Sequence, residues 1–286
     1  MDTLYHYCAT ATFQAIVQNS SVWLSSLTMT NDSSEGQLVR DTLVRLARQD
    51  NLEPAAISKL DAEIRNLEEM FDGLGLCLSE DGDLLSQWRA YTADATGVSI
   101  GFDRVCLEQA VRDATEPEYK HLKLSKVEYS PDGHEELLME IYRDIRKRHE
   151  EGGQNGTGSK LPMDSSTGSW IDDLEDLMTD LSHSRYWKLY EFVPRMYLLK
   201  PPEFREEGEW RLHAIRTRGY RGNYSFHPRS AEIVPYLKFA LEPQRHPISR
   251  IVLGPKHKSE HSTVRLLLQK CGFGHVEIVK SKVSYR

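Results

Sequence analysis

The sequence has few cysteines, no long apolar run and no excess of positive charge. Its four cysteines, Cys8, Cys77, Cys106 and Cys271, lie far apart and form no Cys-x-x-Cys pair, which argues against a zinc ribbon or a disulfide framework. No segment approaches the roughly 18 uninterrupted apolar residues of a membrane span, and the N-terminus lacks a basic region followed by an apolar run. These absences predict a cytoplasmic protein with reduced thiols and no membrane association.

Several catalytic motifs are also missing. The chain has no Gly-x-Ser-x-Gly elbow, and the glycine-rich residues 152–159 lack the Gly-Lys-Ser/Thr ending of a phosphate-binding loop. The net charge of −7 over 286 residues argues against non-specific coating of nucleic acid, although a local basic cleft would not show in the sum. A hydrophobic content of 39% is enough for an ordinary packed core.

Hydrophobic periodicity predicts one α+β domain over residues 1–286, with a mixed or antiparallel sheet of roughly six to eight strands and flanking helices. The segments expected to be extended are residues 4–8, 22–25, 74–78, 98–102, 124–129, 195–199, 209–216, 233–241, 248–253 and 276–279. The expected helices are residues 10–19, 35–49, 55–71, 107–114, 134–151, 170–190 and 259–271, with Thr10 and Ser259 as N-caps. Residues 130–195 are interpreted as a mostly helical insertion.

Polar and aromatic side chains concentrate in residues 79–91, SEDGDLLSQWRAY, just before a predicted strand. Arg89 brings a fork of donors, Gln87 an amide, and Trp88 and Tyr91 bring large rings with polar tips. Burying these groups without partners would cost several kcal/mol. The block is therefore either a structural network, with the arginine satisfying backbone carbonyls beneath a buried tryptophan, or a pocket for an anion or nucleotide.

A second block, residues 206–213, is a charged turn that enters a strand. In an extended chain Glu207 and Glu209 project to the same side, and Arg211 continues that side. These three groups form either a self-neutralising ion-pair ladder or a catalytic edge. Elsewhere, residues 216–229 interleave arginines with aromatic side chains, which is typical of a nucleic-acid surface or of a solvated connection.

Two further patterns favour structural roles. His257 and His261 have the i, i+4 spacing of a metal pair, but Ser259 between them favours a solvated helix start. In residues 31–35, Asn-Asp-Ser-Ser-Glu, the side chains of Asp32 and Ser33 suit the capping of the following helix.

Five motifs in order resemble those of a large bacterial family catalogued as a domain of unknown function. They are Tyr5-His6-Tyr7, Asn-Asp-Ser-Ser-Glu at 31–35, Leu-Ser-Gln-Trp-Arg-Ala-Tyr at 85–91, Glu-x-Glu-Trp-Arg at 207–211 and the basic end at 281–286. The resemblance spans nearly the whole chain and implies no particular reaction.

The order of a Tyr-His-Tyr strand, a serine-bearing second strand and a late Glu-x-Glu strand also resembles ADP-ribosyltransferases. This resemblance implies that NAD is the substrate, with His6 on a ribose hydroxyl, Ser25 at the nucleotide and Glu209 at the nicotinamide ribose. A carboxylate there would stabilise the oxocarbenium charge that develops as the glycosidic bond breaks.

The same resemblance gives roles to the remaining polar residues. Glu207 would orient or deprotonate the acceptor, and Arg89 and Arg211 would pair with the two phosphates of NAD. Gln87 and the ring of Tyr91 complete the expected nucleotide site.

The leading hypothesis is therefore an NAD-consuming ADP-ribosyltransferase-like enzyme, a toxin or defence effector that modifies nucleic acid or protein. The alternative is a non-catalytic module that senses a nucleotide or a partner through the same polar pocket. A third hypothesis is a metal-dependent nuclease with Asp32, Glu35, Asp83 and Glu209 as ligands. The sequence does not decide between catalysis and binding, and it gives no oligomeric state.

Overall fold

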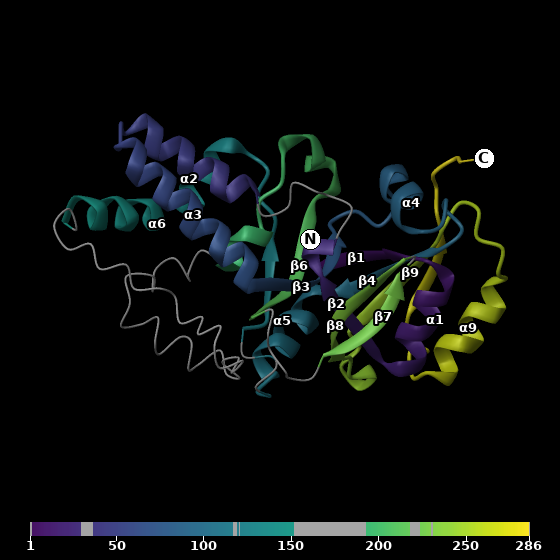
Figure 1. Ribbon diagram of the computed structural model, residues 1–286. Helices are drawn as coiled ribbons and strands as arrows, with labels where there is room; N and C mark the ends of the chain where they lie inside the picture. The colour runs from purple at the N-terminus through teal and green to yellow at the C-terminus, as the bar shows by residue number, and fades with distance from the viewer. Residues whose placement is uncertain are drawn as a thin grey trace.

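The computed structural model describes residues 2–29, 37–116, 119, 121–151, 193–217, 224–229 and 231–285. It confirms the predicted α+β class, because helices flank a mixed, mostly antiparallel sheet (Figure 1). Within these ranges no helix combines the length and the apolar character needed to cross a membrane.

Over the described residues the sheet has ten strands, and its main path runs β10-β9-β4-β1-β3-β2-β8-β7, with β6 on β3 and β5 on β6. Only β9 and β10 pair in parallel among the described strands. The strands are β1 (Thr3–Cys8), β2 (Ser21–Ser26), β3 (Phe71–Ser79), β4 (Val98–Asp103), β5 (Lys123–Lys126), β6 (Glu209–Thr217), β7 (Ser225–Arg229), β8 (Glu232–Ala240), β9 (Ile248–Leu253) and β10 (Glu277–Lys280).

Strand β3 holds the sheet together, because two strands share one of its edges. Its whole length pairs with β6 on one side. On the other side Tyr5 of β1 pairs with Ser79, whereas Ser25 of β2 pairs with Gly75. The first two strands of the chain therefore do not pair with each other, and the proximity of His6 and Ser25 that direct pairing would produce is absent.

The two faces of the sheet carry different helices (Figure 1). Helices α1 (Thr10–Asn19), α5 (Arg104–Asp113) and α9 (His261–Lys270) contribute to one apolar core, which includes Ile100 and Leu78. We call this side the α1 face. Because side chains alternate along a strand, Tyr7, Ser79 and Glu209 project to the opposite side, the α4 face.

Two separate groups cover the α4 face. Helices α2 (Gln37–Gln49), α3 (Pro54–Met70) and α6 (Pro131–Glu151) build one apolar cluster over the first half of β3. Helix α4 (Leu85–Tyr91) covers β1 and β9, where Trp88 packs with Tyr7 and Val252. A polar region of the sheet lies between these two covers.

Glycines let the first group approach β3 closely. A Cβ atom on Gly73 would lie 2.6 Å from the ring of Tyr197, and one on Gly75 would lie 2.9 Å from Leu27. These two large side chains come from the short 3-10 helices η3 (Val193–Tyr197) and η1 (Leu27–Met29). They rest directly on the backbone of the strand.

Several local predictions were wrong. Residues 195–199, expected as a strand, include most of the helix η3, and β7 lies where a connection was one interpretation. Helix α1 has Ala9 at its N-cap and α9 has Glu260, neither with a side-chain cap bond. The Thr10 hydroxyl instead donates to the carbonyl oxygen of Thr96 at 3.1 Å.

The predicted insertion and one motif are described only in part. Helix α6 confirms the predicted helix at 134–151 and packs on α2, where the Tyr142 hydroxyl donates to the Leu46 carbonyl at 3.1 Å. The glycine-rich residues 152–159, the expected helix at 170–190 and the Asn-Asp-Ser-Ser-Glu motif lie outside the described residues.

Candidate functional site

The Glu-x-Glu block forms a buried ionic network on the α4 face, between the two helical covers. Glu209 opens β6, and Arg211, two residues later, projects to the same side of the strand. Arg211 donates from Nε to Glu209 Oε1 at 2.7 Å and from Nη2 to Oε2 at 3.1 Å. Its third bond, from Nη1, goes to the Tyr197 carbonyl at 2.8 Å, which ties the network to η3.

Lys200 links the carboxylate of Glu207 to that of Glu209. Its Nζ lies 2.7 Å from Glu209 Oε2 and 2.8 Å from Glu207 Oε2. Two cations thus balance two carboxylates, and we call Lys200, Glu207, Glu209 and Arg211 the Lys200 network. Glu207 ends the 3-10 helix η4 (Pro202–Glu207), so it reaches the network from outside the predicted strand.

The network keeps its groups charged despite burial. Desolvation opposes ionisation of Glu209, but Arg211 and Lys200 outweigh it and lower the pKa of this carboxyl to about 2. Desolvation likewise opposes the charge of Lys200, yet the nearby Glu209 and Glu207 raise the pKa of the ammonium overall. Glu209 is therefore ionised at neutral pH, and both of its oxygens contact the cations of Arg211 and Lys200.

Two tyrosines border the network. The Tyr129 hydroxyl accepts the backbone N–H of Glu209 at 2.9 Å. Tyr91, at the end of α4, has its pKa raised to about 12, first by burial and then by the charge of Glu207. Gln87 lies on the same side of this short helix and is buried. The structure thus brings Tyr91 close to Glu207, Glu209 and Lys200.

An open cleft of about 600 Å³ adjoins the network, and Glu207 belongs to both. Its lining residues include Tyr5 and Gly82, one arginine, Arg205, and the carboxylates Asp2, Glu80, Asp81, Glu206 and Glu207. Gly82 is required here, because a Cβ at this position would lie 2.4 Å from the Tyr5 ring. The cleft is consequently acidic, with an aromatic ring in its lining.

The other predicted nucleotide contacts lie elsewhere. His6 pairs in register with Ile100 on the α1 face, opposite Glu209, and its Nδ1 lies 2.9 Å from the Cys77 carbonyl. Burial lowers the pKa of this histidine. Ser25 is on the α4 face but pairs with Gly75, on which Leu27 packs. Arg89 is exposed, and its charge contributes to lowering the pKa of Asp94.

Within residues 79–91, Asp83 is the centre of a structural hydrogen-bond network. This carboxylate accepts hydrogen bonds from Trp88 Nε1 at 2.8 Å, from Ser281 Oγ at 2.5 Å and from the Lys282 N–H at 2.7 Å. It therefore fixes the buried indole and anchors the C-terminal segment on α4. Sequence reasoning overlooked this role, although both segments were recognised as motifs; their separation along the chain concealed the contact.

The chain after α4 has an unusual backbone. Ala93, Asp94 and Ala95 all adopt left-handed conformations, with φ of 51°, 58° and 66°. Ala95 is fully buried, and its carbonyl accepts the N–H of Lys256 at 3.0 Å. Gly254 leaves room for this turn, because a Cβ there would lie 2.6 Å from the Ala95 oxygen. Tertiary contacts thus hold a turn that non-glycine residues disfavour.

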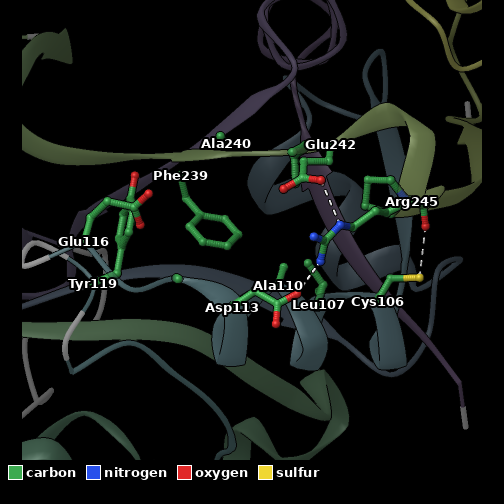
Figure 2. A pocket seen from close by; sticks show the side chains of 13 residues that line it. Cys106, Leu107, Ala110, Asp113, Glu116, Tyr119, Phe239, Ala240, Glu242 and Arg245 are labelled. Atoms are coloured by element: carbon green, nitrogen blue, oxygen red, sulfur yellow. Dashed lines mark hydrogen bonds and ion pairs between the residues drawn. The ribbon is translucent and has the colours of Figure 1, made fainter.

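A smaller pocket of about 120 Å³ lies on the other side of the sheet, between α5 and the end of β8 (Figure 2). Arg245 sits between Asp113 and Glu242, which are both within ion-pair distance, and the Cys106 thiol donates to the Arg245 carbonyl at 3.2 Å. None of the predicted site residues lines this pocket. Its arginine is therefore already paired with two of the carboxylates that line the pocket.

The residues that would form a nuclease metal site do not come together in the described structure. Asp83 is held by Trp88 and the C-terminal segment, and Glu209 by Lys200 and Arg211. Asp32 and Glu35 lie outside the described residues. Across the described part of the chain, no three His, Cys, Asp or Glu side chains gather to hold a metal.

Comparison with known families supports one part of the sequence-based assignment. Residues 87–212 match the model of a family described as a protein of unknown function, DUF2971. The matched stretch contains Gln87, Arg89, Tyr91 and the Glu-x-Glu block, and excludes His6 and Ser25. No curated protein and no solved structure matches the chain significantly. The resemblance to ADP-ribosyltransferases stays a prediction.

Proposed function

We propose that the chain is a binding module that senses a partner through the open cleft, with the Lys200 network as a rigid part of its wall. The main support for this proposal is the position of Glu207, which lines the cleft and lies 2.8 Å from Lys200 Nζ. A carboxylate fixed in this way presents its remaining lone pairs to the cleft without further ordering on binding. Less conformational entropy is therefore lost when a partner binds, which favours binding.

The charge of the cleft selects the ligand class. Two of the five lining carboxylates are already paired with lysines, Glu207 with Lys200 and Glu80 with Lys126. The remaining three, Asp2, Asp81 and Glu206, still outnumber the one lining arginine, so a cationic group is favoured and a nucleotide phosphate is opposed. Arg211, a candidate phosphate ligand, is 1% exposed and already bonded to Glu209 and Tyr197. The favoured partner therefore carries a guanidinium or ammonium group, such as an exposed arginine or lysine of another protein.

Calorimetric titration separates the ligand classes, with a short Arg-rich peptide, NAD and ADP-ribose as probes. The peptide should bind, and more weakly as salt rises. Glu206→Gln should weaken it about tenfold or more, the usual scale for a hydrogen bond to a charged group. Glu136→Gln, which removes an exposed carboxylate on α6, is the matched control and should leave affinity unchanged. Preferential binding of NAD or ADP-ribose would refute the partner-sensing proposal.

One observation favours NAD-consuming, ADP-ribosyltransferase-like activity as the second candidate. Glu209 is held ionised, and Glu207, which shares Lys200 with it, opens on the cleft. A carboxylate beside a bound ribose is what stabilisation of an oxocarbenium ion requires. The assay is nicotinamide release from NAD with protein, DNA and RNA acceptors in turn. Release that is lost in Glu209→Gln supports this candidate, whereas Glu207→Gln should mainly lower transfer to the acceptor, and no release with any acceptor rejects it.

A further inference from the structure

Three aromatic rings pack together on the α4 face near the β7 end of the sheet, and two of them are stacked. Trp23 of β2 and Tyr236 of β8 have ring centroids 4.2 Å apart and an interplanar angle of 24°. His227 of β7 lies 5.3 Å from Trp23 and 5.6 Å from Tyr236. Trp23 is 39% exposed. We call these three residues the aromatic stack.

Strand register explains why the rings share one side. Ser25 and Trp23 alternate with the core residue Leu24, and Tyr236 pairs with Ser25 across β2 and β8. In the ribbon the strands β2, β8 and β7 lie next to one another at the middle of the molecule (Figure 1). The rings are therefore held by three neighbouring strands on a rigid platform. They belong to neither the acidic cleft nor the Lys200 network.

Positive charge borders the stack. Lys238 pairs in register with Trp23, so its side chain leaves the sheet beside the indole, and it is exposed. Arg229, at the end of β7, is 43% exposed and pairs with Glu232 at 3.4 Å. The His227 ring and the Ser25 hydroxyl add further polar groups to this face. The local surface thus differs from the acidic cleft and from the chain as a whole, whose net charge is −7.

We propose that the aromatic stack is a binding site for single-stranded nucleic acid. A base stacks on the exposed part of Trp23, and the phosphate beside that base lies against Lys238. Aromatic side chains bind unpaired bases with little sequence preference, because every base has a π-face. A duplex keeps its bases stacked internally and offers no such face. This site is independent of the function proposed for the cleft.

The test is fluorescence anisotropy of labelled 12-nucleotide DNA and RNA strands, with a duplex of the same sequence for comparison. The single strands should bind, and the duplex should bind much more weakly. Trp23→Ala should lower affinity about 5- to 150-fold, the scale of one lost base stack. Lys238→Gln should weaken binding and reduce the salt dependence, because one phosphate contact is lost.

Controls come from the opposite side of the same strands. Phe226 and Ile233 are 65% and 72% exposed and project to the α1 face. Phe226→Ala and Ile233→Ala should leave affinity unchanged, whereas a loss equal to that of Trp23→Ala would show non-specific apolar adhesion and overturn the proposal. Equal binding of duplex, or no binding by the wild type at low salt, would also overturn it. If Trp23→Ala unfolds the protein, Trp23→Phe and Lys238→Gln carry the test.

Discussion

Lys200 is a single buried cation that helps to compensate the charge of two neighbouring carboxylates. Its side chain is 7% exposed, and its ammonium pairs with both Glu207 and Glu209. Removing one partner of a buried ion pair leaves the other charge without compensation, which costs far more than the pair itself contributes. At the surface the free-energy cost of losing one partner is small, because water solvates the remaining charge.

Replacing Lys200 by methionine should therefore lower the free energy of unfolding by about 3–5 kcal/mol. The matched control is Lys126→Met, which breaks a pair with Glu80 whose side chains are 52% and 32% exposed. That change should cost at most about 1 kcal/mol. Urea unfolding at neutral pH measures both. Equal losses in the two variants would mean that the Lys200 network contributes no more than a surface pair.

His213 gives stability a pH dependence of known sign. Burial, with help from the charge of Arg211, lowers the pKa of this histidine from 6.5 to about 4. Its Nε2 lies 3.1 Å from Ser125 Oγ, and its Nδ1 has no hydrogen-bond partner in the part of the chain that the structure describes. Between pH 6.5 and 4 the unfolded chain binds a proton that the folded chain does not.

The free energy of unfolding should thus fall as pH decreases through this window, by up to roughly 3 kcal/mol from His213. His213→Gln should remove this part of the slope, and His261→Gln, which changes an exposed residue at the start of α9, should retain it. Denaturant titrations at several pH values from 4 to 7 provide the measurement. A wild-type slope that persists in His213→Gln would assign it to other groups.

At the scale of elements, α4 is fixed from both ends. Asp83 precedes the helix and binds the C-terminal segment, and the left-handed turn of residues 93–95 follows it. Near that turn Asp94 accepts hydrogen bonds from the Tyr285 hydroxyl at 2.6 Å and from Lys256 Nζ at 2.8 Å. The C-terminal segment that follows β10 therefore stabilises a helix almost 200 positions earlier in the chain.

An alanine-to-glycine change should have opposite effects on the free energy of unfolding in the turn after α4 and within α4 itself. Ala93 is exposed with φ of 51°, so Ala93→Gly relieves backbone strain and should raise the free energy of unfolding by about 1 kcal/mol. Ala90 is exposed within α4, where Ala90→Gly should lower it by about 1 kcal/mol. Thermal or urea unfolding of the pair tests the turn directly. Loss of stability in both variants would contradict the strained conformation.

At the scale of the whole molecule, sequence patterns correctly predicted the helices and strands whose conformation depends on residues close together in the chain. The alternation in residues 209–216 gave β6, and apolar spacing gave α3 and α9, because burial selects one face of each element. Residues 195–199 were mistaken for a strand, since their apolar side chains are buried in a 3-10 turn on β3. A short apolar run does not distinguish these conformations.

The site was predictable to the same extent. Glu209 and Arg211 were placed correctly on one face because their spacing is local. The positions of His6 and Arg89 were not, because they depend on which strands pair and on how α4 turns over the sheet. Lys200 escaped notice, since an isolated lysine before two prolines carries no pattern. Long-range contacts, rather than composition, determine which charges meet.

The shared edge of β3 also has a consequence for synthesis on the ribosome. When residue 110 has emerged, β1, β3 and β4 can already pair, but β6, β8 and β9, which cover the remaining sides of β3, β2 and β4, have not been made. Open strand edges are templates for aggregation. These edges are covered one after another, and the edge of β4 stays unpaired until more than 250 residues exist, so chaperone protection matters throughout elongation.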